Sequence, residues 1–293
     1  MGVLNMTLTN EPSEQANASA PDLYAVIGSP IQHSKSPLIH NAFAQQTQQS
    51  LSYEAVLGDE NDFKGSVDAF RARGGCGLNV TVPFKQDAFQ YATEHSERAL
   101  RAGAVNTLVF REDGSVLAEN TDGVGIVTDI QNNHQVLISD KRVLILGAGG
   151  AVRGILEPLL SQRPAEVVIA NRTVSKAEEL ATDFSDLGCV AGCGFEAVEG
   201  VFDLIINGTS ASLAGELPPV PEAVIGAETV CYDMMYGADQ TVFNAWADRL
   251  GAKKTIDGLG MLVEQAAESF FIWRGIRPET GAVLEKQRAL LHQ

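Results

Sequence analysis

Short apolar runs and amphipathic stretches alternate along the first 120 residues of this chain. The runs have the length and β-branched content of buried strands, and the stretches between them have helical spacing. The runs span residues 23–28, 52–57 and 77–82, and the stretches lie around 37–49 and 61–73. Because such alternation is typical of βαβ units, we expect an α/β domain with a mainly parallel sheet.

Residues 104–120 predict a hairpin, because two apolar runs flank the turn pair Asp113-Gly114. A first domain closes there, and a second alternation begins at Lys141. Its β-rich runs, RVLIL, EVVIA, FDLII and TVCYD, each lead into glycine or polar residues. Residues 258–276 then carry apolar side chains at helical spacing. The sequence therefore predicts two α/β domains, each with its own parallel sheet, and a long helix near the end of the chain.

The segment GAGGAV at residues 147–152 lies between an apolar run and a helical stretch. In a dinucleotide-binding loop the first glycine permits a tight turn and the next lets the backbone approach a pyrophosphate. The following helix offers free N–H groups to the phosphates. Val152 occupies the third glycine position, so the loop by itself also fits an ordinary strand-to-helix turn.

The next run ends at Asn171-Arg172-Thr173, about 24 residues past Gly147. Dinucleotide-binding domains that use NAD usually place an acidic side chain there, which accepts from the ribose 2′-hydroxyl. Arg172 suits a 2′-phosphate instead, because a guanidinium matches phosphate oxygens. The sequence therefore predicts NADP as the cofactor, with an exposed surface arginine as the alternative explanation.

The segment GSPIQHSKSPLIHNAF at residues 28–43 places Ser34, Lys35 and Ser36 directly before a proline. We expect Ser36 to be a helix N-cap and Pro37 the first helical residue, so that free N–H groups collect there. If the approach to the helix is extended, the hydroxyls of Ser34 and Ser36 point the same way. They could then hold a carboxylate with neutral donors, although a simple capping motif explains the same residues equally well.

Four further polar residues stand near strand ends or helix starts: Thr81, Lys85, Asn106 and Asp122. Each has an ordinary explanation. Lys85 fits a surface lysine, Asn106 a strand-edge amide, and Asp122 the N-cap of a helix near 123–133. Together, however, they lie at the strand ends of one sheet, which is where α/β proteins bind ligands.

The charge and the cysteines exclude several classes of protein. The 293 residues carry a formal net charge of −16, which repels nucleic acid and anionic membranes. The four cysteines form no CxxC pair and predict free thiols in a reducing compartment, with no metal site. No apolar run is long enough to span a membrane, and residues 1–20 are polar. We expect a cytoplasmic protein with a disordered tail over residues 1–20.

Nine ordered motifs make the chain resemble the shikimate dehydrogenase family, from about Leu23 to Leu291. The motifs are GSPIQHSKSPLIHNAF, LNVTVPFK, AGAVNTL, NTDG, GAGGAVRG, ANRT, NGTS, YDMMY and DGLGMLVEQAA. The resemblance implies a discontinuous substrate-binding domain, residues 21–121 and 258–293. A Rossmann-type NADP domain, residues 122–257, would be inserted between its two parts, and the C-terminal helices would return to the substrate domain.

The resemblance also implies a role for each matching residue. The catalytic pair would be Lys85 and Asp122. The substrate-binding residues would be Ser34 and Ser36 at the carboxylate, Thr81, Lys85, Asn106, Asp122 and Gln265 at the ring hydroxyls, and Tyr236 beside the substrate. The NADP-binding residues would be Gly147, Ala148, Gly149, Gly150, Ala151, Asn171, Arg172, Thr173, Thr209, Met234 and Gly258.

The implied reaction is the reversible, NADPH-dependent reduction of 3-dehydroshikimate to shikimate, a step toward chorismate and the aromatic amino acids. A monomer or a homodimer would carry it out. Three alternatives stay open: a quinate/shikimate dehydrogenase with broader substrate and cofactor use, a ligand-sensing paralogue without catalysis, and another reductase on the same dinucleotide scaffold. Arg172 and the two serines disfavour the first, Lys85 and Asp122 disfavour the second, and the substrate motifs disfavour the third.

Overall fold

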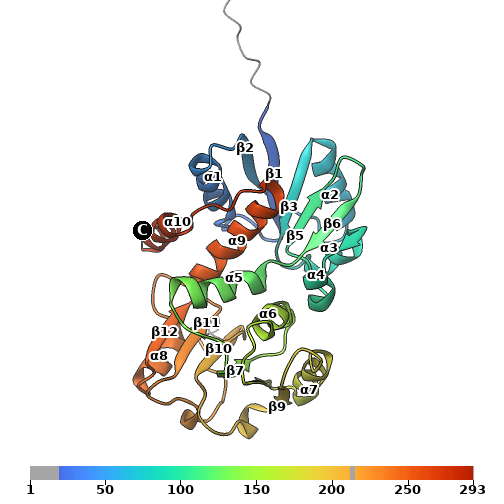
Figure 1. The fold of residues 1–293 in the computed structure, drawn as a ribbon. Helices are drawn as coiled ribbons and strands as arrows, with labels where there is room; N and C mark the ends of the chain where they lie inside the picture. The colour runs from blue at the N-terminus through green and yellow to red at the C-terminus, as the bar shows by residue number, and fades with distance from the viewer. Residues whose placement is uncertain (1–19, 212–214, 293) are drawn as a thin grey trace, which may run out of the picture.

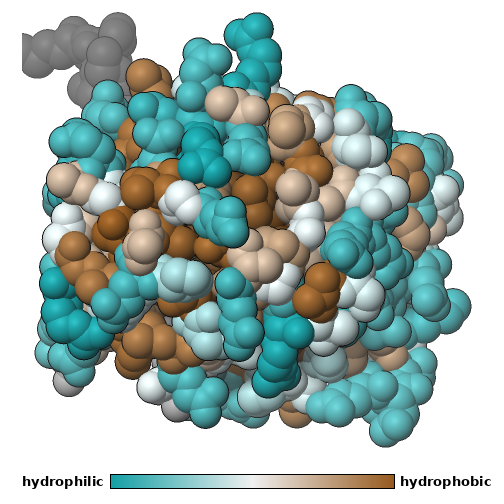
Figure 2. Space-filling view, turned by 90° about the horizontal axis from the view of Figure 1, so that it is seen from below, coloured by the Kyte–Doolittle hydropathy of each residue, from teal (hydrophilic) through white to brown (hydrophobic). Residues whose placement is uncertain are grey.

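The computed structural model describes residues 20–211 and 215–292. Two six-stranded sheets with helices around them form the molecule (Figure 1). The prediction of two α/β units is therefore confirmed. The predicted disordered tail lies outside the described residues, apart from Ala20. Figure 2 views the molecule from below, where hydrophilic side chains form much of the rim and hydrophobic ones gather nearer the middle.

The first sheet has the strand order β2-β1-β3-β5-β6-β4. Its strands are β1 (Asp22–Gly28), β2 (Leu51–Leu57), β3 (Gly75–Val80), β4 (Glu94–His95), β5 (Thr107–Phe110) and β6 (Val116–Glu119). Helices α1 (Ser36–Gln46), α2 (Phe63–Ala72), α3 (Lys85–Tyr91) and α4 (Glu97–Ala102) connect them. Strands β1, β2 and β3 are parallel, whereas β5 pairs antiparallel with both β3 and β6. The predicted hairpin is confirmed, and it makes this sheet mixed.

The second sheet is parallel throughout, with the order β12-β11-β10-β7-β8-β9. Its strands are β7 (Arg142–Leu146), β8 (Glu166–Ala170), β9 (Val190–Cys193), β10 (Leu204–Asn207), β11 (Val230–Asp233) and β12 (Lys254–Asp257). The longer helices beside it are α6 (Gly150–Leu160), α7 (Val174–Asp183) and α8 (Val242–Arg249), with short 3-10 turns η2 (Phe195–Ala197) and η4 (Glu222–Val224). The chain reverses direction across the sheet between β7 and β10, which is the topological switch point of a doubly wound fold.

Two helices lie side by side between the sheets (Figure 1). They are α5 (Asp122–Thr128), which continues into the π-helical turn η1 (Asp129–Asn133), and α9 (Leu259–Arg274). Gly125 permits their close approach, because a Cβ atom there would lie 2.8 Å from the Cβ of Gln265. Helix α9 also packs against α1, and α10 (Gly281–Leu291) packs against both. The C-terminal helices thus return to the first sheet, as the sequence predicts.

The central strands of the second sheet, β7, β10 and β11, are buried because their side chains are mostly apolar on both faces. Val143, Leu144, Ile145 and Leu146 of β7 are all fully buried. No helix in the described ranges is long and apolar enough to cross a membrane.

Candidate active site

A cavity of about 380 Å³ opens between the carboxyl ends of β1 and β3, the two central helices and the loops after β11 and β12. Its volume is typical of a small-molecule site. All eight predicted substrate-binding residues line it: Ser34, Ser36, Thr81, Lys85, Asn106, Asp122, Tyr236 and Gln265. Two residues predicted for the cofactor, Met234 and Gly258, line it too. The fold therefore brings together residues that lie more than two hundred positions apart in the sequence.

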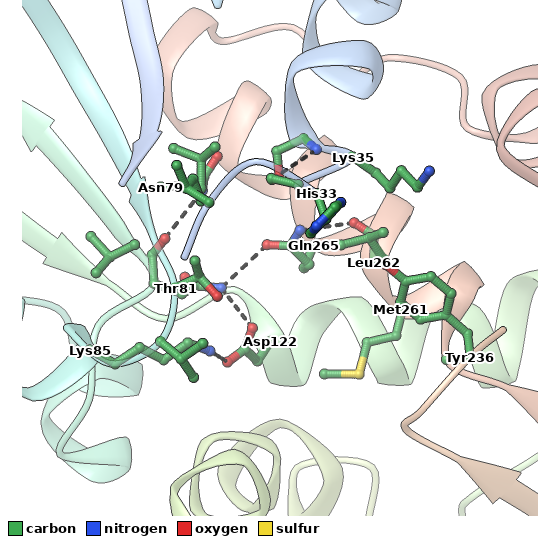
Figure 3. A pocket seen from close by; sticks show the side chains of 18 of the residues that line it. His33, Lys35, Asn79, Thr81, Lys85, Asp122, Tyr236, Met261, Leu262 and Gln265 are labelled. Carbon is green, nitrogen blue, oxygen red and sulfur yellow. Dashed lines mark hydrogen bonds and ion pairs between the residues drawn. The ribbon is translucent and has the colours of Figure 1, made fainter. Parts of the chain in front are cut away.

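Lys85 and Asp122 point toward each other in the cavity (Figure 3). Lys85 is the first residue of α3, and Asp122 is the first residue of α5. The Nζ atom of Lys85 lies 2.5 Å from Oδ2 of Asp122, and their side chains are 30% and 12% exposed. The carboxylate is thus largely removed from water but keeps a cationic donor.

The alternative explanation of Asp122 as a helix N-cap is wrong. Thr121 occupies the N-cap position of α5, and Asp122 is already helical. Its two carboxylate oxygens have other partners, since Lys85 donates to Oδ2 and the Asn106 amide donates to Oδ1 at 2.8 Å. The side chain consequently faces the cavity, where a substrate could meet it.

The side-chain amides of Asn106 and Gln265 lie close together on the cavity wall. The Nδ2 atom of Asn106 lies 3.4 Å from Oε1 of Gln265, and Gln265 donates its own Nε2 to the carbonyl of Leu262 at 2.8 Å. Gln265 comes from α9, so the returning helix contributes to this wall as expected. Amides can donate to and accept from hydroxyls, which suits a polyhydroxylated ligand.

Residues 34–36, the serine segment, differ in backbone conformation from what the sequence predicts. The N-cap of α1 is Lys35, with helical torsion angles (φ −84°, ψ −12°), and Ser36 is the first helical residue. The expectations that Ser36 is the N-cap, that Pro37 comes first and that the approach is extended are therefore wrong. The reason is local, since Oγ of Ser34 accepts a hydrogen bond from the Ser36 backbone N–H at 3.3 Å. Both serines nevertheless line the cavity.

Tyr236 closes the cavity from the second sheet, in the loop after β11. Burial raises the pKa of its hydroxyl, which therefore stays protonated at neutral pH. Met234 and Gly258 follow β11 and β12, and their backbones touch, because a Cβ on Gly258 would lie 2.2 Å from the Met234 carbonyl oxygen. These loops join the cavity to the carboxyl edge of the second sheet.

The glycine loop lies on that same edge, at the switch point. Gly147 has φ +107°, a conformation that favours glycine, and a Cβ there would lie 3.2 Å from the Gly208 carbonyl. A Cβ on Gly149 or Gly150 would meet nothing within 4 Å. The space above the loop is therefore open, and helix α6 begins there with Gly149 as N-cap and no side-chain cap. Free N–H groups that face open space suit a pyrophosphate.

The end of β8 has the features expected of a 2′-phosphate site. Arg172 is exposed, and its guanidinium makes no hydrogen bond or ion pair with the described part of the chain. The side chain of Asn171 donates to the carbonyl of Thr173 at 2.9 Å, which shapes the turn around Arg172. Thr209, after β10, donates its hydroxyl to Oδ1 of Asn207 at 2.7 Å. Ala148 and Ala151 complete the loop, so the residues present fit a dinucleotide.

Sequence reasoning missed several residues that line the cavity: Ile31, His33, Lys35, Asn79, Met261 and Leu262. The signal for Asn79 was available, because it precedes Thr81 by two positions in NVTV and so faces the same side of a strand. Nothing in the sequence singles out the apolar members of this set.

Three family models match the chain. Shikimate dehydrogenase substrate binding domain matches residues 26–108, Shikimate / quinate 5-dehydrogenase matches 130–214, and Shikimate 5'-dehydrogenase C-terminal domain matches 258–286.

Relatives and solved structures agree with these matches. The NADP(+) shikimate dehydrogenase of Cellvibrio japonicus is 59% identical over 273 residues, which cover 93% of this chain and 99% of that protein. The crystal structure of an Ael1 enzyme from Pseudomonas putida has 48% identity and a TM-score of 0.87, with 90% of this chain and 97% of that one covered. A shikimate 5-dehydrogenase from Thermus thermophilus, in complex with NADP(H) and shikimate, has 30% identity and a TM-score of 0.81, with 92% and 100% covered. The chain belongs to the shikimate dehydrogenase family.

Proposed function

We propose that this protein catalyses the reversible reduction of 3-dehydroshikimate to shikimate with NADPH. The observation that carries the proposal is the Lys85–Asp122 pair, which lies in one cavity with the serine segment and beside the edge that carries the glycine loop. The curated relative from Cellvibrio japonicus, which this chain matches over nearly its whole length, is named for this activity.

The cofactor would lie along the carboxyl edge of the second sheet. Gly147 would allow the tight turn, the pyrophosphate would meet the N–H groups from Ala148 to Ala151, and the 2′-phosphate would meet Arg172, Asn171 and Thr173. Thr209, Met234 and Gly258 would lie along the path from the adenine to the cavity. When bound, NADPH supplies the hydride, and NADP accepts it in the reverse direction.

Lys85 and Asp122 would handle the proton. Reduction of a ketone to a hydroxyl requires one hydride on carbon and one proton on oxygen. A lysine Nζ beside that oxygen can stabilise the negative charge that develops there and donate the proton. Asp122 would hold the ammonium in place. When the reaction runs toward oxidation, the Lys85–Asp122 pair would accept the proton that leaves the hydroxyl.

The substrate would be oriented by its carboxylate and its ring hydroxyls. Ser34 and Ser36 would donate to the carboxylate with neutral hydroxyls, and Thr81, Asn106 and Gln265 would bond the ring hydroxyls. Tyr236 would cover the substrate from the cofactor side. Such fixed donors place the reacting carbon at one position, which is how positioning contributes to rate.

We also propose the domain division expected from the sequence. Residues 21–121 and 258–293 would bind the substrate, and residues 122–257 would bind NADP. The separate sheets and the return of α9 and α10 to α1 support this division. The protein would act in the cytoplasm as a monomer or homodimer, which light scattering on the purified protein can distinguish.

The test is an absorbance assay at 340 nm with shikimate and with quinate, each with NADP and with NAD. Turnover of shikimate with NADP, well above the other three combinations, is the expected result. Comparable rates with quinate or NAD would indicate the broader quinate/shikimate dehydrogenase. Binding of shikimate without any turnover would indicate a ligand-sensing paralogue.

A further inference from the structure

A chain of buried hydrogen bonds leads from Asp122 into the first sheet. The Tyr53 hydroxyl donates to Oδ1 of Asn79 at 2.7 Å, and Nδ2 of Asn79 donates to Oγ1 of Thr107 at 3.0 Å. The Thr107 hydroxyl lies 3.0 Å from Oδ1 of Asn106, to which it can donate, and 2.8 Å from Oγ of Ser269, where either hydroxyl can be the donor. The Nδ2 of Asn106 finally donates to Oδ1 of Asp122 at 2.8 Å. All five side chains are buried, so water does not satisfy these groups in place of the chain.

The backbone fixes the direction of this chain at its inner end. Oδ1 of Asn106 also accepts from the backbone N–H of Thr121 at 2.9 Å, and an N–H can only donate. The amide of Asn106 must therefore turn its Nδ2 toward Asp122, whose carboxylate only accepts. A reversed amide would set its N–H₂ against the Thr121 N–H and its oxygen against the carboxylate of Asp122, which is costly for buried groups.

The outer end of the chain is held as a donor as well. Tyr53 is buried beneath the ring of His40, with ring centroids 4.2 Å apart and planes at 2°. Burial raises the pKa of Tyr53 well above its usual range, so the phenol keeps its proton. Burial also lowers the pKa of His40 to about 3, so the stacked ring stays neutral. Neither ring changes its charge near neutral pH.

We propose that Tyr53 and Thr107 are positioning residues for the reaction, because they orient the amides that keep a donor on Oδ1 of Asp122 and leave Oδ2 to Lys85. Neither residue is among those that line the cavity, so each acts through residues that do: Thr107 through Asn106, and Tyr53 through Asn79 and the neighbouring Ser36. Thr107 is therefore the cleaner test of the two. The inference rests on the proposed function. It extends the set of residues that serve the proton transfer from the cavity wall into the interior of the first sheet.

Loss of either hydroxyl should affect proton transfer more than substrate binding. Without the Thr107 hydroxyl, Oδ1 of Asn106 is held by Thr121 alone, so the Asn106 amide is placed less firmly against Oδ1 of Asp122. A weaker hydrogen bond to the carboxylate lets the Lys85–Asp122 pair take up a proton more readily. The acidic limb of the pH profile of kcat should then move to higher pH, while the serine segment still binds the substrate. The other titratable side chains on the cavity wall are His33, Lys35 and Tyr236, and none is hydrogen-bonded by its side chain to the chain from Tyr53 to Asp122 in the described structure.

The experiment compares kcat, KM and the pH profile of shikimate oxidation by NADP in five proteins. They are the wild type, Thr107→Val, Thr107→Ser, Tyr53→Phe and Tyr232→Phe. Thr107→Val keeps the shape of the side chain and removes the hydroxyl, and Thr107→Ser restores the hydroxyl. Tyr232→Phe is the matched control, because the Tyr232 hydroxyl also donates at 2.7 Å in a buried site, to Oδ2 of Asp129. Melting temperatures measured alongside separate stability from positioning.

We expect Thr107→Val to lower kcat roughly 3- to 10-fold, the equivalent of one hydrogen bond, with KM changed less than about 2-fold. Its acidic limb should move to higher pH, Thr107→Ser should restore the wild-type profile, and Tyr53→Phe should change in the same direction. Tyr232→Phe should keep the wild-type profile even if its melting temperature falls.

Three results would overturn the inference. Thr107→Val or Tyr53→Phe with wild-type kcat and an unmoved acidic limb would remove the chain from the reaction, while wild-type turnover would keep the proposed function. Losses equal to those of Tyr232→Phe, with unmoved profiles, would mean that the hydroxyls serve stability alone. Absence of shikimate turnover in the wild type would overturn both the inference and the proposed function. If Thr107→Val does not fold, Tyr53→Phe decides by the same criteria.

Discussion

The Nζ atom of Lys85 and the Oδ2 atom of Asp122 are 2.5 Å apart, although the two residues start different helices. Lys64 and Asp68 show the same distance on the surface of α2, where both side chains are well exposed. An exposed pair of that kind contributes little, because water and salt screen it. Lys85 and Asp122, in contrast, are largely buried, and both line the cavity.

Asp122→Asn should fold normally and turn over slowly. The amide keeps the shape of the side chain but no longer pairs with the Lys85 ammonium as an anion, so we expect kcat to fall roughly 10²-fold or more. Circular dichroism and initial rates at 340 nm check both parts. Loss of the folded state would show instead that the carboxylate mainly stabilises the start of α5.

Ser36→Ala should weaken binding of the substrate carboxylate. A hydrogen bond from a hydroxyl to a charged group contributes about 1.5–3 kcal/mol, so KM for shikimate should rise roughly 10- to 150-fold. The amide of shikimate serves as control, since it lacks the charge and should bind both proteins with similar, poor affinity. Equal losses for the acid and the amide would mean that Ser36 only supports the start of α1.

Arg172→Ala should lose most of the preference for NADP over NAD. A guanidinium contact to a phosphate contributes about 1.5–3 kcal/mol, and the loss should fall on NADP alone. Arg163→Ala is the control, because this exposed arginine precedes β8 and so lies at the opposite edge of the sheet from Arg172. The measurement is the ratio of kcat/KM with NADP to kcat/KM with NAD. An unchanged ratio in Arg172→Ala would show that Arg172 does not recognise the 2′-phosphate.

His40 should make the protein less stable in acid. Burial lowers the pKa of His40 to about 3, whereas the same histidine in the unfolded chain has an ordinary pKa near 6.5. Between these two pH values the unfolded chain binds a proton at His40 and the folded protein does not. Stability therefore falls as the pH drops from about 6.5 toward 3, and by pH 5 this one group costs about 2 kcal/mol.

Urea denaturation at pH 7 and pH 5 measures that effect. His40→Phe, which keeps a flat ring among Phe43, Tyr53 and Phe270, should lose about 2 kcal/mol of the difference between the two pH values. His292→Ala, which alters an exposed ring, should keep the wild-type difference. An identical pH dependence in His40→Phe and the wild type would show that His40 takes up a proton in the folded state.

Periodicity and local motifs predicted much of the fold, and long-range contacts account for what they missed. The run RVLILGAGG predicts β7 and its turn, because strand, glycine and helix follow one another directly in sequence. VAGC of β9 and KTID of β12 are short and carry small or charged residues, so their strand character comes from pairing with β8 and β11. The sequence places the start of α1 one residue too late, because the capping group is the Ser34 side chain that precedes Lys35.

The candidate site shows the same limit. Lys85, Asn106 and Asp122 could be singled out because together they stand at the strand ends of one sheet, where α/β proteins bind ligands. Tyr53 and Thr107 could not, since a tyrosine and a threonine inside strands are ordinary, and their hydrogen-bond partners lie on other elements. Their arrangement depends on tertiary contacts, which no local pattern contains.

The central claim, that Lys85 transfers or stabilises charge in the reaction of shikimate with NADP, is tested most directly by the steady-state kinetics of Lys85→Ala at 340 nm. We expect kcat to fall roughly 10²- to 10⁴-fold with a much smaller change in KM, because the contribution arises in the transition state. Lys64→Ala, which removes the exposed lysine of the matching surface pair, should keep wild-type kinetics. A Lys85→Ala enzyme with near wild-type kcat would contradict the mechanism.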